Sequence, residues 1–187
     1  MDIVRNTTED EFNAWYLRRN CRKHPENSFP VSEAGRSVAM RQDHDGKTRT
    51  WFSTARWSVA KLEPPEFERL VFLDCPWTRR EGLVLPDGPN YRVLSRVAQN
   101  ALASGYLEKT SDPRHRQYYA AMAECHLRLE CTSRLAICSA TEDELQQNPL
   151  AKHYLLDGIG RGLAYMLLLL KSRVPYESVE TFVAERK

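Results

Sequence analysis

The stretch YLLDGIGRG, residues 154–162, places a tight glycine turn between two apolar segments. Residues 154–156 predict a strand, and the apolar run that begins at Leu163 predicts a buried helix over residues 161–171. This order directs main-chain N–H groups and the guanidinium of Arg161 toward a helix N-terminus, where partial positive charge favours an anion. We therefore expect a phosphate site of this protein to lie in this turn.

Length and composition are those of an ordinary globular protein. The chain has 187 residues, of which 42% are hydrophobic and 28% charged, with a formal net charge of +2. This length suffices for a domain with a core, and the small net charge gives no argument for nucleic-acid binding. The longest apolar run, Leu163 to Leu170, falls short of the roughly 20 residues that span a bilayer. We therefore expect no contact with a membrane.

Cysteine usage indicates a reducing compartment. The cysteines are odd in number and form no C-x-x-C pair, and no signal peptide opens the chain. Because disulfides are rare in the cytosol, we expect free thiols in a cytoplasmic protein. Cys125, His126, Cys131 and Cys138 match no usual zinc spacing, so buried thiols are favoured over a metal site.

The first third of the sequence predicts a helix and then a hairpin. Thr8 and Glu11 form a capping box ahead of apolar residues at helical spacing, which predicts a helix over residues 8–23. Trp15 and Tyr16 share this helix with several arginines, a combination that suits nucleic acid or an acidic protein. Packing of the aromatic face on the core is the favoured alternative. The predicted hairpin has a turn at Asp45-Gly46 between two strands, Ser37 to Gln42 and Thr48 to Lys61.

The rest of the sequence alternates helix and strand signals. Pro64-Pro65 starts a short helix, and Gly105 ends a helix that begins at Tyr91. Thr141 and Glu144 form a second capping box. Further segments are a helix from Ser111, a strand over Leu135 to Ser139 and a last strand over Ser178 to Ala184. The pattern is mixed α and β, with strands distributed through the chain.

The order of elements from about Ala55 to Glu185 resembles the ParB/sulfiredoxin superfamily. The matching pieces are Trp57 to Pro64, the helix Tyr91 to Ser104, the strand Leu135 to Ser139, the turn Asp157 to Arg161 and the strand Val179 to Val183. The D-G-x-x-R string is moderately specific between a strand and a helix. The resemblance implies an α+β fold with a mixed sheet, preceded by an N-terminal helix and hairpin. Residues 1–54 are then an extension packed on the core, and residues 55–187 form the domain, with a helical insertion near 108–130.

Members of this superfamily bind nucleotides, so the resemblance implies a nucleoside triphosphate or diphosphate such as ATP or CTP, with Mg²⁺ as helper. It assigns contact with the phosphates to Gly158, Gly160 and Arg161. The implied activity is that of an ATP-dependent phosphotransferase (a kinase) or a nucleotide hydrolase acting on a small molecule. Gly160 stands where many catalytic members carry His, and the turn lacks the Cys of sulfiredoxin, which disfavours sulfinic acid reduction. The alternative is a non-catalytic module that binds DNA, RNA or protein and keeps the fold.

The residue types of the turn also allow a purely structural interpretation. The glycines let a phosphate approach the main chain, and Arg161 can pair with it in a fork. Asp157, the tentative catalytic residue, can orient Arg161, hold a metal or accept a proton from a hydroxyl group. Alternatively, Asp157 caps the helix and the glycines serve only the conformation of the turn.

A second wall of the nucleotide site is expected from the segment Asp74 to Arg80. In ParB-like folds this segment lies between the first strand and the helix. Arg79 can reach phosphates there, and Trp77 can stack on a base. A solvated loop with Trp77 filling the core is the favoured alternative. His153, four residues before Asp157, qualifies as a base only if its strand bends toward the turn, and Arg114-His115-Arg116 is a weaker anion candidate.

Overall fold

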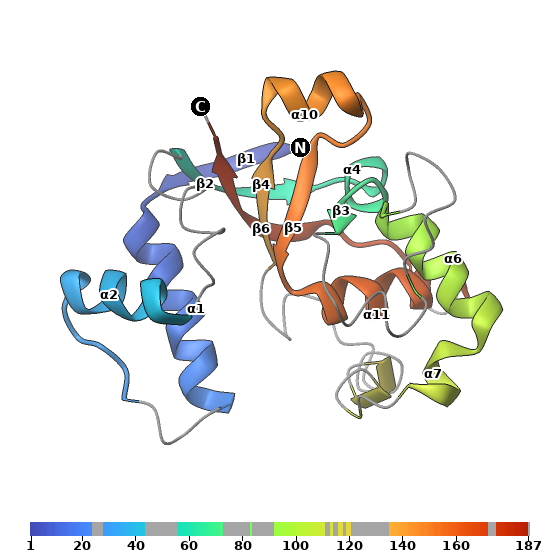
Figure 1. Cartoon of the computed structure of the whole chain (residues 1–187), viewed down its shortest axis with the longest axis horizontal. Helices are drawn as coiled ribbons and strands as arrows, with labels where there is room; N and C mark the ends of the chain where they lie inside the picture. The colour runs from blue at the N-terminus through green and yellow to red at the C-terminus, as the bar shows by residue number, and fades with distance from the viewer. Residues whose placement is uncertain are drawn as a thin grey trace.

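A mixed six-stranded sheet with helices beside it forms the fold (Figure 1). The computed structural model describes residues 1–23, 28–43, 56–72, 83, 92–110, 113, 116–117, 119–120, 135–171 and 175–186. The strands are β1 (Asp2–Thr7), β2 (Arg56–Leu62), β3 (Val71–Phe72), β4 (Leu135–Ser139), β5 (His153–Asp157) and β6 (Val179–Glu185). The helices are α1 (Glu9–Lys23), α2 (Glu33–Asp43), α4 (Pro64–Glu68), α6 (Leu94–Ser104), α7 (Tyr106–Lys109), α10 (Glu142–Gln147) and α11 (Ile159–Leu170). The expected α+β class is confirmed.

The strand order across the sheet is β1-β2-β6-β4-β5-β3. β6 is antiparallel to β2, with Arg56 opposite Glu185 and Leu62 opposite Val179, and parallel to β4. β4 and β5 are antiparallel, whereas β3 and β5 are parallel. The last strand therefore lies inside the sheet, and β1 from the beginning of the chain joins the same sheet by pairing with β2. The expected mixed sheet is present.

Both faces of the sheet are buried along its central strands. Successive residues of β4 alternate between two apolar clusters: Leu135 and Ile137 belong to one, and Ala136 and Cys138 to the other. This alternation follows from the pleat of a strand, which sends neighbouring side chains to opposite faces. The two clusters divide the helices between the faces of the sheet.

Helix α1 packs its aromatic side on one face. The ring of Phe12 stacks on that of Trp57 of β2, with the ring centroids 4.5 Å apart, and Trp15 packs against Phe182 of β6. Tyr16 is partly buried in the same cluster. The structure thus bears out packing of the aromatic face on the core. Arg18 of this helix lies over the ring of Phe29, 5.2 Å from its centroid.

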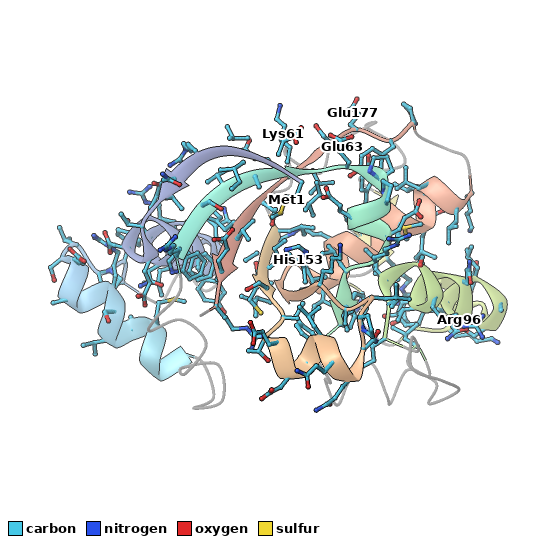
Figure 2. The ribbon with its side chains drawn as sticks, turned by 90° about the horizontal axis from the view of Figure 1, so that it is seen from above. Met1, Lys61, Glu63, Arg96, His153 and Glu177 are labelled. Atoms are coloured by element: carbon cyan, nitrogen blue, oxygen red, sulfur yellow. The ribbon has the colours of Figure 1, made fainter. Side chains whose placement is uncertain are left out.

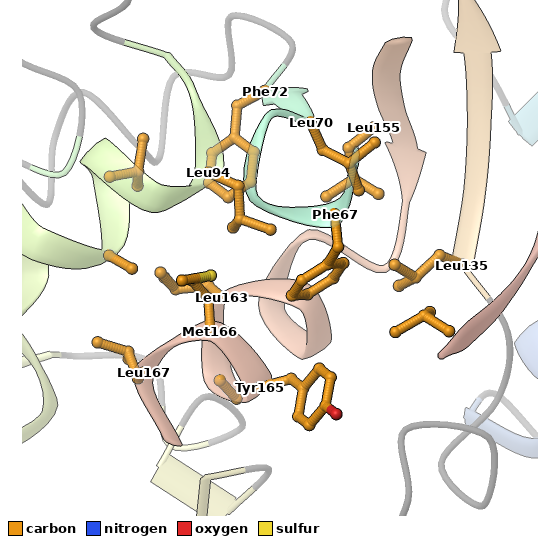
Figure 3. Close-up of a cluster of buried hydrophobic side chains, with 14 of the residues drawn as sticks. Phe67, Leu70, Phe72, Leu94, Leu135, Leu155, Leu163, Tyr165, Met166 and Leu167 are labelled. Carbon is orange, nitrogen blue, oxygen red and sulfur yellow. The ribbon is translucent and has the colours of Figure 1, made fainter. Parts of the chain in front are cut away.

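Helices α11, α6 and α4 supply the core on the other face (Figure 3). Leu163, Met166 and Leu167 of α11 are almost fully buried, as is Leu94 at the start of α6. Phe67 of α4 lies 5.4 Å from Tyr165 of α11, measured between ring centroids. This packing holds α11 in place from end to end, which matters for the turn that precedes it.

Local sequence signals predicted several element ends correctly. Thr141 and Glu144 form the reciprocal capping box at the start of α10, and Glu144 also binds Arg186 beyond the end of β6. Gly105 adopts the left-handed conformation, with φ of 65°, and ends α6. Pro64 and Pro65 occupy the first turn of α4. These signals act within a few residues of chain, so they do not depend on the tertiary structure.

The predicted hairpin is wrong as a pairing, although residues 56–61 of its second strand lie in β2. Residues 37–42 lie in helix α2 and not in a strand, and β2 pairs with β1 and β6. The side chain of Ser32 accepts a hydrogen bond from the N–H of Gly35, which starts the helix. Arg36 then binds Asp10 of α1 through both carboxylate oxygens. This tertiary ion pair favours the helical conformation over the extended one. The predicted turn at Asp45-Gly46 lies outside the described residues.

Two strands were not predicted. β1 is an edge strand whose residues are mostly exposed, so it lacks the alternation of apolar and polar residues that predicts a strand. β3 consists of Val71 and Phe72. A strand this short exists only because β5 and Val93 pair with it. Most of the predicted helix from Ser111, within the proposed insertion, lies outside the described residues.

We predict that Phe12→Ala destabilises the protein by about 3–5 kcal/mol, the usual cost of removing a fully buried aromatic ring. Phe12 is 1% exposed and joins α1 to β2 and β6. Val38→Ala on α2 is the control, because Val38 is 53% exposed and its loss should change the free energy of unfolding by under about 0.5 kcal/mol. Urea unfolding of both variants measures the difference, and equal midpoints would contradict the docking of α1.

Candidate functional site

The candidate site is the turn that joins β5 to α11. Asp157 is the last residue of β5, and Gly158 follows in the left-handed conformation, with φ of 90° and ψ of 20°. Helix α11 begins at Ile159, and the N–H of Gly162 donates to the carbonyl of Gly158 over 2.8 Å. The N–H groups of residues 159–161 therefore precede the first hydrogen bond within the helix. The predicted strand, turn and helix are present at this place.

Gly158 is required by its conformation and by its neighbours. A Cβ atom on this residue would lie 2.4 Å from Cδ2 of Leu135 and 2.8 Å from Nη2 of Arg161. Side chains rarely adopt its positive φ. Because Gly158 has no side chain, Leu135 of β4 and the guanidinium of Arg161 can lie close to the main chain of the turn. Leu135 was not predicted as part of this site, because it comes from a separate strand and carries no local signal.

Arg161 and Asp157 form an ion pair inside the turn. Nη2 of Arg161 lies 3.0 Å from Oδ2 of Asp157, one helical turn earlier in the chain. The side chain of Arg161 is 5% exposed and that of Asp157 is 17% exposed. A guanidinium is buried at such low exposure only when a counter-charge accompanies it. Asp157 therefore makes the contact with Arg161 that orienting this guanidinium would require.

The first turn of α11 contains one charged side chain, that of Arg161. Apart from Arg161, the turn contains Ile159 and glycines, no acidic side chain lies in it, and the N-cap Gly158 offers no side chain to cap the helix. Helices α1 and α10 differ, because acidic residues occupy their first turns. Among the residues that the structure describes, Asp157 is an acidic side chain next to this positive end of the α11 dipole.

The predicted site residues divide into two groups. Asp157, Gly158, Gly160 and Arg161 lie together in the turn, and Gly160 is partly exposed in the first turn of the helix. Trp77 and Arg79, the predicted second wall, lie outside the described residues. The site described here is therefore the turn itself.

His153 lies at the opposite end of β5 from Asp157. Four residues of a strand extend about 13 Å, which is too far for His153 to act as a base in the turn. Burial lowers the pKa of its imidazole, while the carboxylate of Glu66 acts in the opposite direction. Glu66 also binds the amino group of Met1. Both Met1 and His153 can be found by their labels in Figure 2. His153 belongs to this separate group of charges.

Other candidates for chemistry are limited within the described residues. No group of three or more His, Cys, Asp or Glu side chains is placed there to hold a metal ion. Cys138 is buried as a free thiol, and burial raises its pKa to about 12. This thiol is therefore protonated and unreactive at neutral pH. In the same part of the chain, no helix has the length and apolar character needed to cross a bilayer.

No family model, curated protein or solved structure matches the chain. The geometry of the turn therefore carries the functional argument.

We predict opposite effects for two glycine substitutions in this segment. Gly158→Ala should destabilise the protein by about 2 kcal/mol or more, because it combines a left-handed backbone with a collision against Leu135. Gly162→Ala should be neutral or stabilise by up to about 1 kcal/mol, since its Cβ would lie 3.5 Å from Leu155 in ordinary contact and alanine favours a helix. Thermal or urea unfolding compares the two, and a tolerated Gly158→Ala would contradict the geometry of the turn.

We also predict a pH effect for His153→Gln. Because burial lowers the pKa of His153 below its value of about 6.5 in the unfolded chain, the unfolded state binds the proton first as the pH falls. The stability contributed by neutral His153 is therefore complete above about pH 6.5 and declines below it. The variant should lose less free energy of unfolding than the wild type between pH 7 and pH 5. Identical slopes in urea titrations at several pH values would contradict the prediction.

Proposed function

We propose that this protein binds a nucleotide in the cytoplasm and holds its phosphates at the turn of residues 158–161. One observation carries the proposal: α11 begins behind a left-handed glycine, with N–H groups ahead of its first internal hydrogen bond and no acidic side chain in its first turn. Such a helix N-terminus favours an anion through its N–H groups and its dipole. Gly160 leaves the main chain partly exposed at this point.

The order of elements supports assignment to the ParB/sulfiredoxin-like class. The strand β2 ends at Leu62, the segment Leu62-Glu63-Pro64 leads into α4, and the helix α6 follows after the short strand β3. The strands β4 and β5, the glycine turn, the apolar helix α11 and the strand β6 then complete the order on which the resemblance rests. A nucleotide such as ATP or CTP is the ligand that this class implies.

Mg²⁺ would arrive bound to the phosphates of the nucleotide. This ion is commonly held by one or two carboxylates together with phosphate oxygens, so it needs no complete protein cage. Asp157 is the carboxylate of the turn and is the residue that would face such an ion. The bound ion would neutralise phosphate charge next to this carboxylate.

Phosphoryl transfer to a small molecule, or hydrolysis of the nucleotide, is the activity proposed if the site is catalytic. Asp157 is the candidate to accept a proton from the attacking hydroxyl group or water. Gly160 supplies no side chain where many catalytic members of the ParB/sulfiredoxin superfamily carry His, so nucleotide binding is the primary proposal and catalysis the secondary one. Trp77 and Arg79 remain the proposed second wall, next to the base and the phosphates.

We predict that Gly160→Asp weakens nucleotide binding at least tenfold without unfolding the protein. A carboxylate at this position repels phosphate, yet an acidic residue in the first turn of a helix is favourable to the helix itself. Gly160→Asn is the matched control, because it has nearly the same size without the charge. Calorimetry with ATP, ADP, CTP and GTP, each with Mg²⁺, should give at least tenfold weaker binding for the Asp variant than for the Asn variant, a difference of about 1.4 kcal/mol.

Thermal unfolding of the same two variants checks that the fold is intact. The melting temperature of Gly160→Asp should equal or exceed that of Gly160→Asn. A wild-type protein that binds none of the four nucleotides would refute the proposed function. Equal nucleotide affinities of the two variants would place the nucleotide elsewhere on the protein.

A further inference from the structure

The strand β1 forms one edge of the sheet and lies open to solvent. It pairs on one side with β2 and is the outermost of the described strands at this edge (Figure 1). Ile3 and Val4 are 57% and 52% exposed. The opposite edge is β3, which has two residues, and Val71 of this strand also forms a bridge to Val93. β1 is thus the longer edge, and an edge strand presents main-chain N–H and C=O groups that can pair with another strand.

A bulge in β1 puts Asp2 and Arg5 on the same face of the sheet. Asp2 lies opposite Lys61 of β2. Arg5 lies opposite Val59, and the register shifts between these two pairs. Residues two apart in a regular strand share a face, and so do residues directly opposite each other in antiparallel strands. Asp2 and Arg5 therefore share a face although they are three residues apart, because Val4 is an additional residue in this strand.

This arrangement makes the edge complementary to itself. When a second β1 runs antiparallel about a two-fold axis between Ile3 and Val4, Asp2 of each copy lies opposite Arg5 of the other. Such an axis, perpendicular to the sheet, requires the two charged residues to share a face. Opposite charges across two strands favour pairing, and each contact forms twice by symmetry. Ile3 of each copy then lies opposite Val4 of the other, so these exposed apolar side chains meet at the axis.

Arg5 is held in a position that suits this pairing. Its guanidinium binds both carboxylate oxygens of Glu11 in α1, with Nη1 2.9 Å from Oε2, and its side chain remains 42% exposed. A guanidinium has five N–H donors, so a bond to one carboxylate leaves donors for a second. The contact with Glu11 also restricts the rotamers of Arg5, which lowers the entropy lost when Asp2 of a second copy binds.

We infer that β1 is a docking edge for a second copy of this chain, whose own β1 pairs with it antiparallel and extends the sheet across two subunits. The inference does not depend on nucleotide binding. The occupant follows from the edge, because a partner strand must carry a positive and a negative charge at matching positions and a second β1 has both. Since an edge of six residues buries a small area, the dimer is weak and forms as the protein concentration rises.

Sedimentation equilibrium of the untagged full chain, at concentrations up to about 1 mM, tests the inference. The wild-type protein should dimerise as its concentration rises. Asp2→Lys and Arg5→Glu should each weaken the dimer at least about tenfold, because each places like charges opposite one another twice. Glu68→Lys is the control: it changes the net charge as Asp2→Lys does, at an exposed position of α4, and should dimerise like the wild type.

An equimolar mixture of Asp2→Lys and Arg5→Glu is the decisive measurement. In the mixed dimer, both opposing pairs again join opposite charges, so the mixture should dimerise at concentrations at which neither variant does so alone. Failure of two folded variants to restore each other would overturn the inference. A wild type that stays monomeric up to about 1 mM would also overturn it, as would a dimer that tolerates both substitutions.

Val4→Lys gives a second readout that leaves the contact between Arg5 and Glu11 in place. It puts a charge at the two-fold axis, opposite Ile3 of the second copy, and should weaken the dimer at least about tenfold. Val31→Lys is the matched control, since Val31 is 89% exposed and lies outside β1. Equal dimer affinities of these two variants would overturn the inference, and this comparison decides if Arg5→Glu does not fold.

Discussion

The close approach of Gly158 to Leu135 and Arg161 is the constraint on which the rest of the site depends. It brings together the start of β4, the end of β5 and the first turn of α11 at a point where an added methyl group would have to displace the side chains of Leu135 and Arg161. With the turn held there, α11 lies along α6 and buries its apolar residues from its first turn onward. Burial of these side chains in turn supplies the hydrophobic stabilisation that holds the glycine in its left-handed conformation.

The sheet shows the same dependence on distant parts of the chain. β6 is the last strand in the sequence but lies between β2 and β4, so the sheet is complete only after the C-terminal segment has joined it. The ring of Phe182 in this strand contacts Phe12 and Trp15 of α1, which links the two ends of the chain through one apolar cluster. Formation of such long-range contacts is the slow part of folding, because loop closure precedes them.

Sequence reasoning succeeded where a signal acts over a few residues. The capping box of Thr141 and Glu144, the left-handed Gly105 and the buried strand Leu135 to Ser139 all appear as expected. It failed at residues 37–42, which are helical because Ser32 caps the helix and Arg36 reaches Asp10. It also missed β1, since an exposed edge strand has no buried face to impose an alternating pattern.

For the candidate site, the sequence by itself determined the turn: Asp157 at the end of a strand, glycine next, and an apolar helix that contains Arg161 in its first turn. These features follow from chain neighbours and from the permissive backbone of glycine. Only the tertiary structure decided where the guanidinium lies. Leu135 from another strand and the interior behind Gly158 leave it a place beneath the turn, and Asp157 supplies the counter-charge that its burial requires. No spacing along the chain encodes that choice, because it depends on which surfaces pack around the turn.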